Sequence, residues 1–283
     1  MTGAPISRVA FAGTPDFAVP ALSALLDDAR FEVVAVLTQP DRRAGRGRRV
    51  QPGPVKALAL ARGAAVLQPD DPGDDATLAA LSELRPDLIV VAAYGRLLSE
   101  RFLGIARCGT INVHASLLPR WRGAAPIERA IIEGDEETGI SIMRVVRRLD
   151  AGPVILKRRC PVGAHVTGGE LRAQLAELGA VALLAALEAA PDGSWQETPQ
   201  TESEATYAAK ITGADTQLDW QEPAVLLARK IRAFSPEPGM RAALGQLEVK
   251  IRRADAQPLA GKHAPGTIVS VSRDGIDVAT GDG

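Results

Sequence analysis

The chain has 283 residues, of which 46% are hydrophobic and 24% charged, so it is long enough for about two domains with buried cores. Its 33 Lys and Arg residues nearly balance its 34 Asp and Glu residues, which excludes a uniformly basic nucleic-acid-coating protein. Two distant cysteines, Cys108 and Cys160, exclude a disulfide framework. Because no secretory signal and no membrane-spanning apolar run is found, we expect a cytoplasmic protein.

The first half of the chain alternates short apolar runs with helical stretches. Strands are predicted at residues 8–13, 31–38, 64–67, 87–93 and 110–114, and helices at residues 20–26 and 56–62. This alternation predicts an α/β fold, with a Rossmann-like, mostly parallel sheet and helices on both faces. Ligands of such sheets bind beyond the carboxyl ends of the strands.

A helix and a polar stretch follow this predicted sheet. Thr167 and Glu170 form a capping box ahead of a long apolar segment, which predicts a helix packed on the sheet. Residues 191–206 are polar, contain prolines and have no periodicity. Such a stretch is typical of an interdomain linker.

The last part of the chain is rich in strand signals. One helix and three short alternating segments are predicted, at residues 222–234, 247–253, 266–271 and 275–279. The pattern favours a small OB-like β-barrel. The chain therefore divides into a first domain of residues 1–190, a linker of residues 191–206 and a barrel domain of residues 207–283. Because a strand signal stands directly before Gly283, we expect this barrel to be truncated, with one edge open.

His114 is the histidine best placed for chemistry. The other two, His165 and His263, have no acidic or cysteine partner at ligand spacing, so we expect no metal site. His114 ends an apolar strand, and strand alternation places Asn112 on the same side. Two polar groups then face the rim where α/β sheets bind ligands, although a purely structural histidine is an open alternative.

Asp150 is the best candidate for a carboxylate partner of this histidine. It follows the strand-like run of residues 139–146 and precedes Gly152 and Pro153, again at a strand end. A histidine that moves protons is commonly oriented by a carboxylate. The alternative is that Asp150 only forms the turn.

Five arginines are concentrated in the loop of residues 41–49, after the second predicted strand. They are Arg42, Arg43, Arg46, Arg48 and Arg49. Arginines interrupted by glycines fit contact with phosphate groups, and a solvated charge run is the alternative. No GxGxxG, P-loop or GxSxG motif is found, which disfavours nicotinamide, ATP and serine-hydrolase sites. The basic loop indicates a polyanionic substrate.

Over nearly its whole length the chain resembles the methionyl-tRNA formyltransferases. The block NVHASLLPRWRGAAP at residues 112–126 is shared by the wider group of transferases that use 10-formyltetrahydrofolate, so it indicates chemistry rather than acceptor. The acceptor is indicated by the arginine loop and by the C-terminal part. Further matching segments are residues 11–18, 39–42, 91–95, 149–153, 207–211, 218–220, 231–234 and 238–239.

The resemblance implies a role for each group of candidate residues. Asn112, His114 and Asp150 would form the catalytic set of a formyltransferase domain, and the loop arginines would contact the acceptor stem of the tRNA. The implied co-substrate is 10-formyltetrahydrofolate, and the implied partner is initiator methionyl-tRNA, used in translation initiation. Because the sequence shows no obvious apolar interaction stripe, we expect a monomer. The implied folate contacts are Ala93, Tyr94, Ser116, Leu117, Leu118 and Pro119.

Several positions depart from the family pattern. Ala151 stands where the family commonly has threonine, Val146 and Arg148 replace an acidic residue and a glycine, and Met240 and Arg241 replace an aromatic residue and threonine. Two alternatives to the main interpretation stay open. One is a related folate-dependent formyltransferase acting on a nucleotide-linked amine, and the other is a non-catalytic RNA-binding protein.

Overall fold

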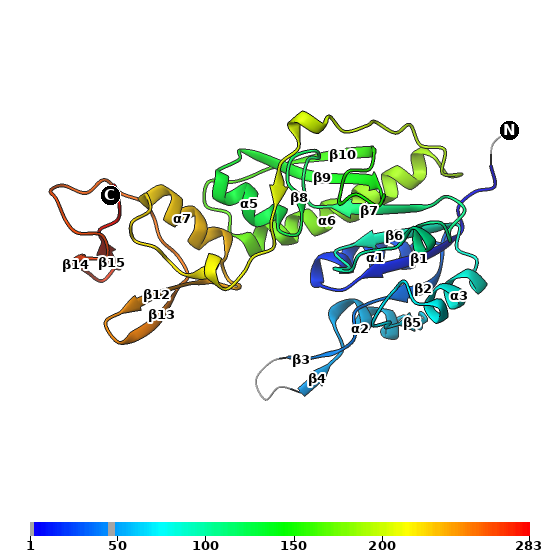
Figure 1. Cartoon of the computed structure of the whole chain (residues 1–283), viewed down its shortest axis with the longest axis horizontal. Coiled ribbons are helices and arrows are strands. Elements are labelled where there is room, and N and C mark those ends of the chain that lie inside the picture. Colours follow the sequence, from blue (N-terminus) through cyan, green and yellow to red (C-terminus); the bar gives the residue numbers. More distant parts are fainter. Residues whose placement is uncertain (1–2, 45–48) are drawn as a thin grey trace. The chain divides into compact units, whose positions relative to one another are not determined.

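The computed structural model describes residues 3–44 and 49–283. Its centre is a seven-stranded sheet with the order β10-β9-β7-β6-β1-β2-β5 (Figure 1). The strands are β1 Arg8–Gly13, β2 Glu32–Leu37, β5 Val66–Leu67, β6 Leu88–Ala92, β7 Thr110–His114, β9 Glu137–Arg144 and β10 Val154–Pro161. The first five of these are parallel, and β9 runs antiparallel to β7. The predicted Rossmann-like α/β sheet is confirmed.

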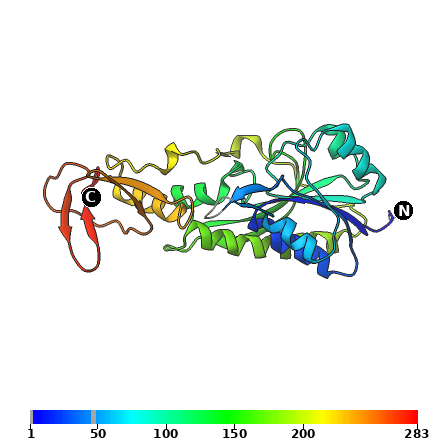
Figure 2. The same cartoon turned by 90° about the horizontal axis from the view of Figure 1, so that it is seen from below.

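Helices cover both faces of this sheet (Figure 2). On one face lie α1 Val19–Asp27, α2 Pro54–Ala61 and α6 Gly168–Ala189, and on the other lie α3 Asp75–Glu83 and α4 Glu100–Leu103. Every residue of β6 is buried, because a central parallel strand has both faces covered. Ala10 and Ala12 of β1, on one side of the strand, pack with Leu78 and Leu81 of α3.

The start of α6 has the predicted capping box. The backbone N–H of Glu170 donates to Thr167 Oγ1 at 3.2 Å, and the Thr167 N–H donates to Glu170 Oε2 at 2.9 Å. Further along, a Cβ atom on Gly179 would lie 2.9 Å from Val113 Cγ1 of β7. Glycine at this position therefore allows the helix to approach the strand that carries the candidate histidine.

The connections near the sheet contain short elements. These are η1 Asp16–Ala18, the hairpin strands β3 Arg42–Ala44 and β4 Arg49–Gln51, β8 Arg122–Gly123, η2 Glu202–Glu204 and β11 Tyr207–Ala208. Most of them follow the carboxyl ends of strands, where the chain crosses the rim of the sheet. The β3–β4 hairpin projects from the sheet edge beyond β2 (Figure 1).

The contacts divide the chain into two compact units. The first holds the sheet and also residues 191–207, so the polar stretch predicted as a linker packs with the sheet unit. The predicted domain boundaries stay a prediction. No helix among the described residues is long and apolar enough to span a membrane.

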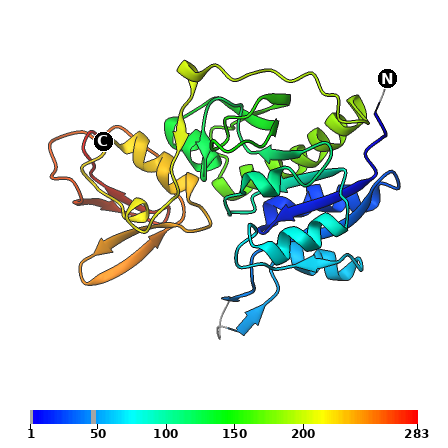
Figure 3. The same cartoon turned by 45° about the vertical axis from the view of Figure 1, so that its right-hand side comes forward.

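The second unit combines helices with two antiparallel hairpins (Figure 3). Its elements are α5 Pro126–Glu133, η3 Ala214–Thr216, α7 Ala224–Ala233, β12 Met240–Leu244, β13 Leu247–Ile251, β14 Ile268–Val271 and β15 Ile276–Val278. In β12 and β13, Met240 pairs with Ile251 and Leu244 with Leu247. The C-terminal part is thus built from small antiparallel strands, as the sequence pattern indicates.

Candidate active site

The carboxyl end of β7 places two candidate side chains on one side of the strand. His114 is the last residue of β7 and is only 5% exposed. Asn112 lies two residues earlier, opposite Met143 of β9, and its side chain is partly exposed. Among the described residues, the Asn112 amide has no hydrogen-bond partner. The amide is therefore free to donate to a bound molecule.

His114 has a defined ring orientation. Its Nε2 atom lies 2.9 Å from the carbonyl oxygen of Trp121, and its Nδ1 atom lies 3.8 Å from Asp150 Oδ2. Because a carbonyl oxygen only accepts hydrogen bonds, Nε2 must carry a proton. The ring nitrogen without this hydrogen bond is therefore Nδ1, on the side of the carboxylate.

Asp150 is held by backbone geometry as well as by hydrogen bonding. Its φ of 47° lies in the left-handed region that favours glycine, and the Gly123 N–H donates to its Oδ2 atom at 2.8 Å. Trp121, whose carbonyl faces His114, has a φ of 63°. Strained backbone of this kind persists only where surrounding contacts enforce it, and it is common at functional sites.

The carboxyl ends of β1, β2 and β6 are joined by a second set of hydrogen bonds. Gln39 Nε2 and Thr14 Oγ1 both donate to the Tyr94 carbonyl, at 2.8 and 3.3 Å. A Cβ atom on Gly13 would lie 2.9 Å from the Ala92 carbonyl, so glycine allows the strand ends to approach closely. Ala93 follows directly, is exposed and has a φ of 47°.

The residues implied as folate contacts differ in accessibility. Tyr94 is buried, and burial raises the pKa of its phenol to about 12. The hydroxyl of Ser116 donates to the Arg120 carbonyl at 2.6 Å, and Leu118 packs against Met143 and Val154. These three side chains shape the loop around the site. The partly or fully exposed members of the set are Ala93, Leu117 and Pro119.

The arginine loop is an antiparallel hairpin in which Arg42 pairs with Gln51 and Ala44 with Arg49. Arg46 and Arg48 lie outside the described residues. Asp41, at the base of the hairpin, accepts hydrogen bonds from Lys56 Nζ at 2.6 Å and Gln68 Nε2 at 2.9 Å. These bonds hold the pKa of Asp41 below its usual value, and they fix the hairpin base to the sheet.

Comparisons with known proteins show the family of this chain. Residues 7–187 match the formyl transferase family, and residues 210–283 match the formyl transferase C-terminal domain. The methionyl-tRNA formyltransferase of Aromatoleum aromaticum is 51% identical over 99% of this chain and 88% of its own length. That of Pseudomonas putida (strain GB-1) is 49% identical over 97% of this chain and 88% of its own length. The chain belongs to the methionyl-tRNA formyltransferase family.

Solved structures agree with this family at the level of the fold. HypX from Aquifex aeolicus in complex with tetrahydrofolic acid aligns with a TM-score of 0.66 and 19% identity, over 99% of this chain and 43% of that protein. Glycinamide ribonucleotide transformylase 1 from Symbiobacterium toebii aligns with a TM-score of 0.55 and 22% identity, over 69% of this chain and 95% of that protein. The predicted resemblance is confirmed, and the chain is a formyltransferase.

In this member of the methionyl-tRNA formyltransferase family, Asn112 lies two residues before His114 on β7, and the structure brings His114 Nδ1 and Asp150 Oδ2 within 3.8 Å of each other. Sequence analysis missed the groups that orient them, namely the Trp121 carbonyl and the Gly123 N–H. Both lie in the 112–126 block. Residues of almost every type have a backbone carbonyl and N–H, so the sequence alone does not show that these two groups have a role. Among residues 3–44 and 49–283, no group of three or more His, Cys, Asp or Glu side chains is arranged to hold a metal ion.

Two of the departures from the family pattern lie beside Asp150. Arg148 pairs with Glu202 and donates to the Tyr207 hydroxyl, so it ties the Asp150 loop to residues 202–207. Ala151 is half-buried, and its N–H donates to the Arg148 carbonyl at 3.3 Å. The loop thus keeps its turn with Ala151 in place of threonine.

Proposed function

We propose that this chain transfers the formyl group of 10-formyltetrahydrofolate to the α-amino group of methionyl initiator tRNA, with Asn112, His114 and Asp150 as the catalytic set. The observation that carries the proposal is that the three groups lie on β7 and on the loop that faces its carboxyl end. An unpartnered amide, an oriented imidazole and a carboxylate lie at the ligand-binding end of the sheet. Relatives about half identical in sequence are named for this activity.

The reaction needs a neutral amine and a stabilised oxyanion. An α-amino group has a reference pKa of about 7.7–8.0, so a useful fraction is neutral near pH 7. Its nitrogen forms a bond to the formyl carbon, and the carbonyl oxygen gains negative charge. The Asn112 amide donates a hydrogen bond to this oxygen, in the manner of an oxyanion hole. The bond from the formyl carbon to N10 then breaks.

One proton must leave the attacking amine and one must reach the departing N10. With Nε2–H donated to Trp121, the Nδ1 lone pair of neutral His114 accepts the first proton. Asp150, 3.8 Å away, stabilises the imidazolium that results. The same Nδ1 atom then returns the proton to N10. Because the acceptor amine is itself the nucleophile, no covalent enzyme intermediate is required.

The two substrates approach from different segments. For the folate we propose contacts along Ala93, Tyr94 and residues 116–119, which border the site. For the tRNA we propose phosphate contacts from Arg42, Arg43, Arg46, Arg48 and Arg49. Arginine forms bidentate contacts with phosphate. The hydrogen bonds from Lys56 and Gln68 to Asp41 fix the position of the first residue of the hairpin loop.

The direct test is an acceptor assay with purified protein. We expect 10-formyltetrahydrofolate to be consumed only when charged initiator tRNA is present, and formylmethionine to be recovered from the tRNA. Uncharged tRNA and free methionine serve as controls. Formylation of a nucleotide-linked amine instead would reassign the acceptor, and no formyl transfer to any amine would overturn the proposal.

A further inference from the structure

Residues 197–206, here called the strap, cross the loops that hold the catalytic set. Thr198 exchanges two backbone hydrogen bonds with Val154, both 2.8 Å long. At the other end, the Trp121 N–H donates to Thr206 Oγ1 at 2.9 Å. The strap therefore contacts both segments that orient His114, the Asp150 loop and the Trp121 loop.

Gln200 lies in the middle of the strap and forms its most specific contacts. Its Nε2 atom donates to the carbonyl oxygens of Asp150 and Gly152, at 2.8 and 2.7 Å. Its Oε1 atom accepts from Arg122 Nε at 3.0 Å. Carbonyls only accept and a guanidinium only donates, so these partners determine which way the amide faces.

Arg122 extends this contact to the second loop. Its side chain is fully buried and pairs with Glu202 of the strap at 3.0 Å, and its backbone N–H donates to the Thr206 carbonyl at 2.9 Å. Arg122 directly follows Trp121, whose carbonyl orients His114. One amide side chain thus connects the carboxylate loop with the loop that sets the imidazole.

We propose that Gln200 is a positioning residue that holds the Asp150 carboxylate against His114 Nδ1. The inference rests on the proposed roles of Asp150 and His114. Asp150 has a left-handed backbone, which needs external contacts to persist, and Gln200 supplies two hydrogen bonds across this turn. Gln200 touches no reacting atom in this scheme.

The test is a substitution that keeps the shape of the Gln200 side chain and replaces its donor group with an acceptor. Gln200→Glu puts a second acceptor oxygen against two carbonyl oxygens, so we expect kcat to fall about 10- to 100-fold, within the range of a misaligned catalytic group. KM for folate and tRNA should change less than about twofold, because the strap is not assigned to either substrate. Gln196→Glu is the matched control. Its side chain is exposed and has no hydrogen-bond partner among the described residues, and full activity is expected.

A double-mutant cycle separates positioning from general structural damage. In the Asp150→Asn background, Gln200→Glu should lower kcat by less than about twofold, because the carboxylate that Gln200 positions has already been removed. Equal losses in both backgrounds would overturn the inference, as would unchanged kcat in Gln200→Glu. Gln200→Met, which removes the same bonds without adding charge, replaces the glutamate variant if that one fails to fold. If Asp150→Asn alone leaves kcat unchanged, the proposed catalytic role fails instead.

Discussion

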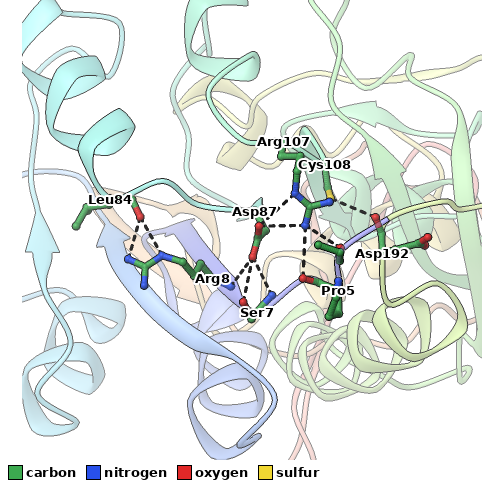
Figure 4. Close-up of polar contacts among 9 residues, drawn as sticks. Pro5, Ser7, Arg8, Leu84, Asp87, Arg107, Cys108 and Asp192 are labelled. Carbon is green, nitrogen blue, oxygen red and sulfur yellow. Dashed lines mark hydrogen bonds and ion pairs between the residues drawn. The ribbon is translucent and has the colours of Figure 1, made fainter. Parts of the chain in front are cut away.

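The two ends of the parallel sheet each contain a hydrogen-bonded aspartate, but the surroundings of the two carboxylates differ. At the amino end, Asp87 accepts hydrogen bonds from the backbone N–H groups of Ser7 and Arg8, both at 2.9 Å (Figure 4). Arg107 pairs with the same carboxylate at 3.0 Å and donates to the Ala4 carbonyl at 2.9 Å. The Cys108 thiol donates to the Asp192 carbonyl, and burial raises the pKa of this thiol.

At the carboxyl end, polar groups are left incompletely satisfied. The Asn112 amide has no hydrogen-bond partner in the described part of the chain, and the His114–Asp150 pair is separated by 3.8 Å. Asp150 and Trp121 both have left-handed backbone. The difference teaches that charge pairs alone do not mark a site in this fold. Among the described residues, left-handed backbone at Arg85 and an unpartnered Thr110 hydroxyl also occur near the amino end. What distinguishes the carboxyl end is that an unpartnered amide lies on the same strand as an imidazole that faces a carboxylate.

The largest expected effect is on the histidine at the carboxyl end. His114→Asn keeps a polar side chain but cannot carry the proton between the amine and N10, so we expect kcat to fall about 10²- to 10⁴-fold. Single-turnover formylation measures this step. Arg107→Lys at the amino end is the contrasting variant and should leave kcat unchanged. Equal losses of kcat in both variants would contradict the assignment of different roles to the two ends of the sheet.

Removal of the unpartnered amide should affect catalysis more than binding. Asn112→Ala is expected to lower kcat about 10²- to 10³-fold, the usual cost of one oxyanion donor, while the Kd for 10-formyltetrahydrofolate stays within about threefold. Stopped-flow turnover and equilibrium titration of folate measure the two quantities. A parallel loss of folate affinity and turnover would show that Asn112 binds the ground state instead.

The arginine hairpin should act on affinity and its dependence on salt. Replacing Arg42 and Arg43 by alanine should raise the KM for tRNA. It should also reduce the slope of log KM against log salt concentration by about 2, because each phosphate contact contributes about 1 to that slope. Arg101→Ala is the control, since Arg101 is exposed and, within the described part of the chain, pairs only with Asp75 at the surface. An unchanged slope would remove the hairpin from the tRNA site.

The smallest effect concerns stability at the amino end. Burial raises the pKa of Asp87, but the hydrogen bonds from Arg8, Ser7 and Arg107 outweigh burial, and the net pKa lies below the usual value. A carboxylate whose pKa is lowered in the folded state stabilises the fold at pH values above its unfolded-state pKa of about 3.9. This stabilisation is lost as the pH falls from that value through the lower, folded-state pKa.

We therefore expect Asp87→Asn to lose about 2 kcal/mol of unfolding free energy at pH 7, with the deficit shrinking below about pH 4. Urea unfolding at pH 7 and pH 3.5 measures it, and kcat of the folded variant should be unchanged. A deficit that is constant across this range would contradict the assigned ionic contacts.

Much of the architecture could be predicted from local patterns. The apolar run that became β6 and the alternation in β7 follow directly from burial on two faces and from the period of a strand. The Thr167–Glu170 capping box needs only residues three positions apart. Element boundaries moved by one or two residues, as at the helix predicted for 222–234, which spans Ala224–Ala233, because packing decides where the ends fray.

The sequence by itself determined the fold class, the family and the residue types of the proposed catalytic set, because these depend on periodicity and on short motifs. Only the tertiary structure decided which atoms meet. The Trp121 carbonyl sets the tautomer of His114, and Gln200, in a stretch with no pattern of its own, joins the Asp150 loop 50 residues away in the chain. The reason is physical. A hydrogen bond between distant residues depends on the folded path of the backbone, and no local spacing encodes it.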